Sequence, residues 1–427
     1  MSFEISKVRA REVLDSRGNP TVEVEVWANS IMGRATAPSG ASTGIHEAVE
    51  LRDNDPKRYN GKGVIHAVEN VNTKIAEALT GFDCTKQQQI DNKLIELDGT
   101  SNKANLGANA TIATSIAVAK CAAACKNLPL YKSLNPVASL LPVPMFNVLN
   151  GGKHAGTKLA PQEFLIMPIS APNFHEALRM ASETYHKLGK IVQDRYGVSA
   201  KNVGDEGGYA PNMTHTSEAL ECLTTAIKQA GYTKEIYLAI DPAASSFYNE
   251  EKGTYLIDGK DMTAPELVDY WIELTTKYPI VSVEDPFQEE DFDSFAELTK
   301  KIGKRIQVIG DDIFVTNVRR IKEGITRHAA NSVLIKLNQI GTVTETVKAI
   351  TLTLENGWTT VVSHRSGETE DTTIADFAVG MGTGQIKTGA PARGERTAKY
   401  NQLLRIEEEL GKDAKYAGKS FTFSKHT

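Results

Sequence analysis

The stretch NSVLIKLNQIG, residues 331–341, joins a short apolar run to a lysine. Val333, Leu334 and Ile335 are branched and apolar, and a run of this kind predicts a buried strand. The run stops at Lys336, although lysine is rarely buried without a partner. A single lysine in this position usually marks the point where a strand reaches solvent. The ends of the other apolar runs in the chain argue against that interpretation.

Four further apolar runs also end on ionisable side chains. They are IYLAIDP, IVSVEDP, IQVIGDD and TTVVSHRS, and their last polar groups are Asp241, Glu284 with Asp285, Asp311 with Asp312, and His364 with Arg365 and Ser366. Segments with helical periodicity, such as APELVDYWIELTTKY (264–278), lie between the runs. This alternation predicts parallel strands that are covered by helices on the outside.

The chain is predicted to be an α/β protein with two domains. The stretch TVEVEVWA (21–28) alternates strictly and predicts an antiparallel strand with one wet side. Helical segments follow it, and a proline-rich stretch at 128–144 is the best candidate for a junction. We therefore expect a smaller N-terminal α+β capping domain over residues 1–135. A C-terminal (β/α)8-type barrel is expected over residues 136–427, which is long enough for this fold.

Composition excludes several classes of protein. The chain has 427 residues, 41% of them hydrophobic and 24% charged, with a net charge of −5. These values argue against a dedicated nucleic-acid binder or a polybasic membrane binder. The N-terminus has no apolar segment typical of a signal peptide, and no uninterrupted run of 18 apolar residues occurs. We expect a soluble, cytoplasmic protein without a conventional membrane-spanning helix.

The four cysteines, Cys84, Cys121, Cys125 and Cys222, form no CxxC pair and no disulfide framework. Cys121 and Cys125 are four residues apart and share one face of a predicted helix. This spacing is compatible with half of a metal site. The pattern favours the simpler interpretation of small buried hydrophobic residues in a reducing compartment.

The strand ends predict an active site. Barrel enzymes build their active sites where the carboxyl ends of the parallel strands emerge, so the polar groups at the five strand ends should meet in one cleft. Asp241, Glu284 and Asp311 would repel one another there unless a cation compensated them. Ligands that are all oxygen suit Mg²⁺ or Mn²⁺. Lys336 beside such a metal would have a lowered pKa and could act as a general base on a weakly acidic C–H.

Other segments supply further candidates. The glycine-flanked NVGDEGGYAPN (202–212) contains Asp205 and Glu206, and LNGGKHAGTKLAPQEF (149–164) contains His154, Gln162 and Glu163. Plain turn chemistry is the alternative interpretation of these two segments. Arg365 and Ser366 form a natural phosphate grip, because the guanidinium fork matches phosphate oxygens. QIKTGAPARGER (385–396) adds the cation Lys387.

Together these motifs resemble the enolase family. The matching stretches run in order from about residue 4 to residue 411: DSRGNPTVEVEV, PSGASTG, NGGKHAG, QEF, NVGDEGG, VEDPF, GDD, IKLNQIG, SHRSGETED and IKTGAPARGER. The resemblance implies the Mg²⁺-dependent, reversible dehydration of 2-phospho-D-glycerate to phosphoenolpyruvate in glycolysis and gluconeogenesis. It also implies a homo-oligomer, either a dimer or an octamer.

The resemblance assigns a role to each candidate residue. Two Mg²⁺ ions are implied per active site, the first held by Asp241, Glu284 and Asp311 and the second by Ser42 in the PSGASTG loop. Lys336 would remove the C2 proton, and Glu206, assisted by Glu163, would protonate the departing C3 hydroxyl. The substrate contacts implied are Lys387 with the carboxylate, Arg365 and Ser366 with the phosphate, and His154 and His364 as lining residues.

Two other functions compete with this one. The first is another metal-dependent member of the same superfamily that acts on a non-phosphorylated carboxylate, but SHRS and PSGASTG argue against it. The second is a binding or structural protein on a scaffold that has lost its activity. Such a loss usually removes a catalytic group, and every group expected of the family is present in the chain.

Overall fold

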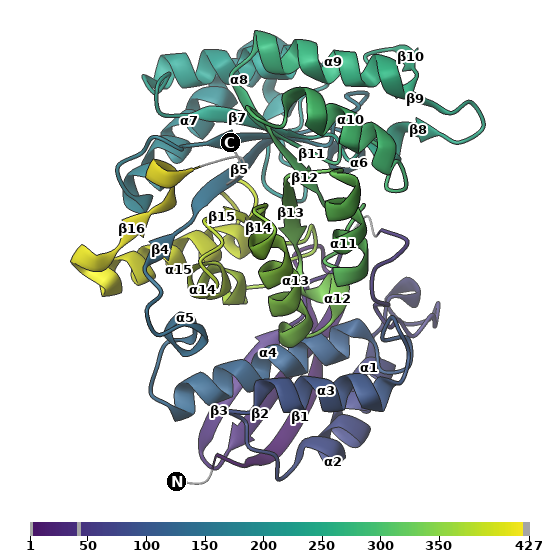
Figure 1. Cartoon of the computed structure of the whole chain (residues 1–427), viewed down its shortest axis with the longest axis vertical. Helices are drawn as coiled ribbons and strands as arrows, with labels where there is room; N and C mark the ends of the chain where they lie inside the picture. The colour runs from purple at the N-terminus through teal and green to yellow at the C-terminus, as the bar shows by residue number, and fades with distance from the viewer. Residues whose placement is uncertain (1–2, 41–43, 422–427) are drawn as a thin grey trace.

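The computed structural model describes residues 3–40 and 44–421, apart from the side chains of residues 153–154 and 419–420. Figure 1 shows a smaller N-terminal part, with a purple sheet and blue helices, packed against a larger barrel. This architecture confirms the predicted fold class. The predicted division of the chain between residues 135 and 136 stays a prediction.

The N-terminal domain is built on an antiparallel sheet of three strands, β1 (Ile5–Leu14), β2 (Pro20–Ala28) and β3 (Ile31–Thr36). Val22, Val24 and Val26 are fully buried on one face of β2, as the alternating pattern predicts. The expectation of a wet opposite face is wrong for Glu25, which is only 4% exposed. Its carboxylate accepts hydrogen bonds from Arg11 and Arg34 on the two neighbouring strands. These ion pairs make burial of that charge possible.

Short helices and one long helix follow the sheet. In chain order they are η1 (Tyr59–Gly61), α1 (Ile65–Asn70), η2 (Val71–Ile75), α2 (Ala76–Leu79), α3 (Gln87–Asp98), α4 (Ala108–Cys125) and α5 (Leu130–Leu134). α4 lies directly on the sheet, and its approach is closest at Gly33. A Cβ atom at Gly33 would lie 2.2 Å from the carbonyl oxygen of Ala117 and 2.3 Å from the amide nitrogen of Cys121. Only glycine permits this contact.

In the described part of the chain, α4 alone is long and apolar enough to cross a membrane by length and composition. This helix contains no uninterrupted apolar run of 18 residues, because threonine, serine and asparagine are spread along it. In the folded protein, 83% of α4 is buried, which is typical of the core helix of a globular domain.

Eight strands close into the barrel in the order β11-β12-β13-β14-β15-β5-β6-β7. Their bounds are β5 (Val143–Asn150), β6 (Glu163–Met167), β7 (Tyr237–Asp241), β11 (Ile280–Glu284), β12 (Gln307–Gly310), β13 (Ser332–Ile335), β14 (Thr359–Ser363) and β15 (Gln385–Lys387). One strand departs from the expected parallel arrangement, because β6 is antiparallel to both β5 and β7. The loop from β5 to β6 contains only the four-residue α6 (Gly152–Ala155). A parallel crossover normally needs a longer helical connection.

The remaining elements surround the barrel or form small outlying sheets. The helices are α7 (Phe174–Tyr196), η3 (Val198–Lys201), α8 (Thr216–Ala230), η4 (Ala244–Phe247), α9 (Ala264–Lys277), α10 (Phe292–Ile302), α11 (Val318–Arg327), α12 (Leu337–Ile340), α13 (Val343–Glu355), α14 (Thr373–Gly380), α15 (Gly394–Leu410), η5 (Gly411–Asp413) and η6 (Ala417–Ser420). The outlying strands are β4 (Leu140–Leu141) with β16 (Lys415–Tyr416), and β8 (Tyr248–Asn249), β9 (Thr254–Ile257) and β10 (Lys260–Met262).

Polar side chains join the two domains. Asp371, in the segment between β14 and α14, accepts hydrogen bonds from the Lys120 ammonium at 2.8 Å and from the amide of Thr36 at 3.1 Å. On α3, the buried Asp91 accepts a hydrogen bond from the amide of Thr344 on α13 at 2.8 Å. Through these contacts, the N-terminal domain is attached to the segments that follow β13 and β14.

The contact between β3 and α4 yields a stability prediction. We expect Gly33→Ala to destabilise the protein by about 3 kcal/mol, because its Cβ would meet the backbone of α4, which cannot rotate away. A lower midpoint of urea-induced unfolding would show this loss. Gly394→Ala is the matched control, since a Cβ has open space there, and its effect should stay within about 0.5 kcal/mol. Equal effects of the two substitutions would contradict the proposed steric cause.

Candidate active site

The ionisable groups at the strand ends gather at one end of the barrel. Asp241, Glu284 and Lys387 are the last residues of β7, β11 and β15. Asp311, Lys336 and His364 directly follow β12, β13 and β14. Glu163 is the first residue of β6, and because this strand runs in the opposite direction, its start lies at the same end.

Most of the candidate residues from the sequence line a single cleft. The predicted residues among its walls are Glu163, Glu206, Asp241, Asp311, Lys336, His364, Arg365, Ser366 and Lys387. Glu284 is joined to this group through Lys387. Two predicted residues cannot be placed in this way. Ser42 lies outside the described residues, and His154 belongs to α6 with a side chain that lies outside them.

Lys387 holds the carboxylates together. Its Nζ lies 2.7 Å from Asp241 Oδ2, 2.9 Å from Glu284 Oε1 and 3.1 Å from Glu163 Oε2. Burial by itself would lower the pKa of Lys387, but the three carboxylates raise it well above its ordinary value. The side chain is therefore a permanent buried cation among the acidic groups.

Lys336 makes a similar pair with Asp311. Its Nζ donates a hydrogen bond to Asp311 Oδ2, and Gln339 donates another to Asp311 Oδ1 at 2.9 Å. Burial, together with Arg365 and Lys387, acts to lower the pKa of Lys336, but Asp311 and Asp312 outweigh them and raise it. The sequence led us to expect a lowered pKa. In this structure, Asp311 keeps the lysine protonated.

The donor set fits a hard divalent cation. Burial raises the pKa of Glu163 and of Glu284 well above the ordinary value, and neighbouring carboxylates raise each further. Such groups stay anionic only where positive charge lies close to them. Among the described residues, the candidate ligand atoms are all carboxylate oxygens, which suit Mg²⁺ and do not select for zinc.

A second acidic group lies beside the first. Within the described residues, Asp285, Asp311 and Asp312 form a cluster of carboxylates whose oxygens lie within 4.8 Å of one another. Asp285 already has a structural role, because its two oxygens accept hydrogen bonds from the amides of Asp311 and Asp312 at 2.8 and 2.7 Å. It thus orients the turn that carries Asp311 into the cleft.

Glu206 faces His364 across the cleft. Nε2 of His364 lies 3.2 Å from Glu206 Oε2, and Asn147 donates a hydrogen bond to the same oxygen at 2.9 Å. Burial lowers the pKa of His364 to about 4, so the ring is neutral. Nδ1 lies 2.7 Å from Arg396 Nη1, and because an arginine can only donate, Nδ1 accepts and Nε2 carries the proton. The imidazole therefore presents an N–H to Glu206.

Arg365 already has an anionic partner. Its guanidinium forms a two-pronged ion pair with Glu47, with N···O distances of 2.9 and 3.1 Å. Glu47 belongs to the same loop as PSGASTG, on the N-terminal domain. The carboxylate lies where the fork of Arg365 would hold another anion of similar geometry.

Several residues that organise the site were not predicted from the sequence. Arg396 is fully buried and donates to the carbonyl oxygens of Arg365 and Ser366, each at 2.6 Å. Glu47, Asn147 and Gln339 were also missed. Arg396 lies within the APARGER motif, so its place in the sequence was a signal for it. The contacts of the other three join segments that are far apart in the sequence, so no local pattern indicated them.

Comparisons with known proteins agree with this arrangement. Residues 5–134 match the family model described as "Enolase, N-terminal domain", and residues 138–425 match "Enolase, C-terminal TIM barrel domain". Curated relatives called enolase include that of Methanocaldococcus jannaschii, 58% identical over 98% of both chains. Those of Thermococcus kodakarensis and Pyrococcus furiosus are each 57% identical over 98% of both chains.

The two family models together span nearly the whole chain, in the order in which the capping domain and the barrel occur. With this coverage, and with relatives of such identity, the chain belongs to the enolase family.

Proposed function

We propose that this member of the enolase family is a lyase that catalyses the Mg²⁺-dependent, reversible dehydration of 2-phospho-D-glycerate to phosphoenolpyruvate. The observation that carries the proposal is that Lys336 lies on the opposite wall of the barrel from Glu163, the neighbour of the proposed acid Glu206. β13 and β6 are four strands apart in either direction around the closed eight-stranded ring. An elimination needs a base and an acid on different sides of the substrate, and this separation provides them.

Lys336 is the base in the proposed reaction. Its side chain is 15% exposed, so the ammonium nitrogen can be reached from the cleft. Burial, Arg365 and Lys387 act to lower the pKa of Lys336, against Asp311 and Asp312, which raise it. In its neutral form the lysine would accept the C2 proton of the substrate.

Glu206 is the acid, with Glu163 beside it. Glu206 donates a proton to the C3 hydroxyl, which leaves as water when the C3–O bond breaks. Asn147 donates a hydrogen bond to one oxygen of Glu206, and Nε2 of His364 lies 3.2 Å from the same oxygen. Burial, and after it the negative charge of Glu206, raises the pKa of Glu163 well above its ordinary value.

The cations of the cleft bind the two charged ends of the substrate. Arg365 and Ser366 hold the phosphate, for which the planar fork of arginine is suited. Lys387 contacts the carboxylate, and His154 and His364 line the space between the two ends. A cytoplasmic location and a homo-oligomeric state, as a dimer or an octamer, stay predictions.

The metal ligands are proposed from the same donor set. Asp241, Glu284 and Asp311 hold the first Mg²⁺, and Ser42 contributes to the second. When bound, the two ions stabilise the additional negative charge that develops on the substrate carboxylate after proton loss.

The role of Lys336 is tested by its removal. We expect Lys336→Ala to lower turnover of 2-phosphoglycerate by about 10²- to 10⁴-fold, because it removes the general base. The measurement is the ultraviolet absorbance of the enol phosphate product in the presence of Mg²⁺. Lys348→Ala, an exposed lysine on α13, is the matched control and should retain full activity. A folded wild-type protein without turnover in Mg²⁺ would refute the proposed reaction.

Removal of one metal ligand tests the metal site without using activity. We expect Mg²⁺ to raise the Tm of the wild-type protein, because the folded state alone gathers the ligands. Glu284→Gln keeps the shape of the side chain and an oxygen that accepts from Lys387, but it removes a negative charge. Its Tm without metal should stay close to the wild-type value, and the Mg²⁺-dependent rise should largely disappear. An undiminished rise would show that Mg²⁺ binds elsewhere.

A further inference from the structure

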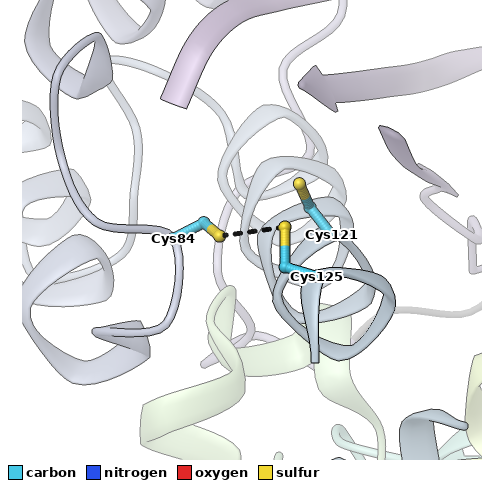
Figure 2. Close-up of side chains that lie close together, drawn as sticks. All are labelled: Cys84, Cys121 and Cys125. Atoms are coloured by element: carbon cyan, nitrogen blue, oxygen red, sulfur yellow. Dashed lines mark hydrogen bonds between the residues drawn. The ribbon is translucent and has the colours of Figure 1, made fainter. Parts of the chain in front are cut away.

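Three cysteines meet in the N-terminal domain, outside the catalytic cleft. Figure 2 shows Cys84 pointing from its loop toward α4, where Cys121 and Cys125 lie one turn apart. The three sulfur atoms lie within 4.8 Å of one another, and Cys84 Sγ is 4.0 Å from Cys125 Sγ. The spacing of Cys121 and Cys125 along the sequence indicated only half of a site. The loop before α3 adds the third sulfur.

The surroundings combine burial with access from one side. Cys84 and Cys121 are fully buried, whereas Cys125 is half-buried near the end of α4. An ion could therefore enter past Cys125, and water could complete its coordination there. Burial and the charge of Cys121 raise the pKa of Cys125, and the carboxylate of Asp83 adds a smaller effect in the same direction.

The thiols already share protons in an unequal way. Hydrogen bonds from Cys84 and Cys125, with others from the backbone amides of Ala28 and Gly33, lower the pKa of Cys121 to about 7. Hydrogen bonding to Cys121 and burial raise the pKa of Cys84 far above its ordinary value. Metal binding uses the thiolate form of each cysteine.

The separation of the sulfurs is close to that of a metal–thiolate site. Zinc–sulfur bonds of about 2.3 Å at a tetrahedral angle place neighbouring sulfurs about 3.8 Å apart. The observed 4.0 Å between Cys84 and Cys125 needs only a small adjustment of side chains. The net charge of a site with three thiolates is −1 with a divalent ion and −2 with a monovalent ion. Because burial disfavours net charge, the divalent ion is favoured.

We propose that Cys84, Cys121 and Cys125 form a binding site for one thiophilic divalent cation, such as Zn²⁺. Binding releases the thiol protons to solvent and joins the sulfurs to the ion. The site ties the end of α4 to the loop before α3, and through that loop to the N-terminal strand region, where the amide of Cys84 donates to the carbonyl oxygen of Phe3 at 2.9 Å. Its role is structural and does not depend on the proposed reaction.

A disulfide is the other chemistry open to these residues. A bond between Cys84 and Cys125 would need a two-electron oxidant and would leave Cys121 without its present partners. An ion uses all three sulfurs and needs no oxidant. The geometry of three converging thiols therefore favours metal binding.

The test is a titration of the reduced, full-length protein with Cd²⁺ in saturating Mg²⁺. Cd²⁺ bound to thiolates produces ultraviolet charge-transfer absorbance, which carboxylate ligands do not produce. We expect saturation near one Cd²⁺ per chain. We also expect Zn²⁺ to displace the absorbance and to raise the Tm in the absence of substrate.

Single substitutions identify the ligands. Cys125→Ala is the best tolerated because this side chain is half-buried, and it should weaken Cd²⁺ binding by about tenfold or more. Cys84→Ser should do the same. Cys222→Ala is the matched control, since this buried thiol contacts Arg195 elsewhere in the fold, and it should leave binding unchanged. No charge-transfer absorbance in the folded wild-type protein, or full absorbance in Cys125→Ala, would overturn the proposal.

Discussion

The ammonium of Lys387 connects the ends of four barrel strands. It extends from β15 and lies within 3.1 Å of acidic groups on β7, β11 and β6. Three carboxylates cannot stay ionised at this depth without a cation, and the lysine cannot stay buried without anions. Each charge is acceptable only in the closed barrel, which brings all four strand ends to one place. The chemistry of the cleft therefore depends on the closure of the ring.

The N-terminal domain contributes to the same balance of charge. It brings Glu47 against Arg365, which follows β14 and whose guanidinium is nearly fully buried. It is also held by Lys120 and Thr36 to Asp371, a few residues beyond the same strand. The segment after β14 thus carries both Arg365, the proposed phosphate ligand, and the attachment point of the smaller domain. Packing between the domains would therefore help to position the proposed phosphate grip.

The strand ends could be predicted from the sequence because a buried apolar run that stops on an ionisable residue is a local pattern. Asp241, Glu284, Asp311 and Lys336 were all found in this way. The reversed direction of β6 was missed, although its short connection to β5 was a signal for it. The contacts of Glu47 and Cys84 could not be predicted, because their partners are far away in the sequence and depend on loop geometry. For the same reason, the raised pKa of Lys336 was not anticipated: it depends on its contact with Asp311.

In the described part of the cleft, lysines occupy the positions proposed for the metal ions, and a glutamate occupies the position proposed for the substrate phosphate. Lys387 and Lys336 supply positive charge to the carboxylates of the metal-ligand set, and Glu47 supplies a planar anion to Arg365. In the proposed reaction, binding would exchange these partners: an entering cation would take the place of a lysine, and the substrate phosphate would take the place of Glu47. Such an exchange avoids leaving any buried charge unpaired, which would cost several kcal/mol. Asp311 is both a proposed metal ligand and the partner of Lys336. In the proposed reaction, metal binding and the protonation of the base would therefore be coupled through this one carboxylate.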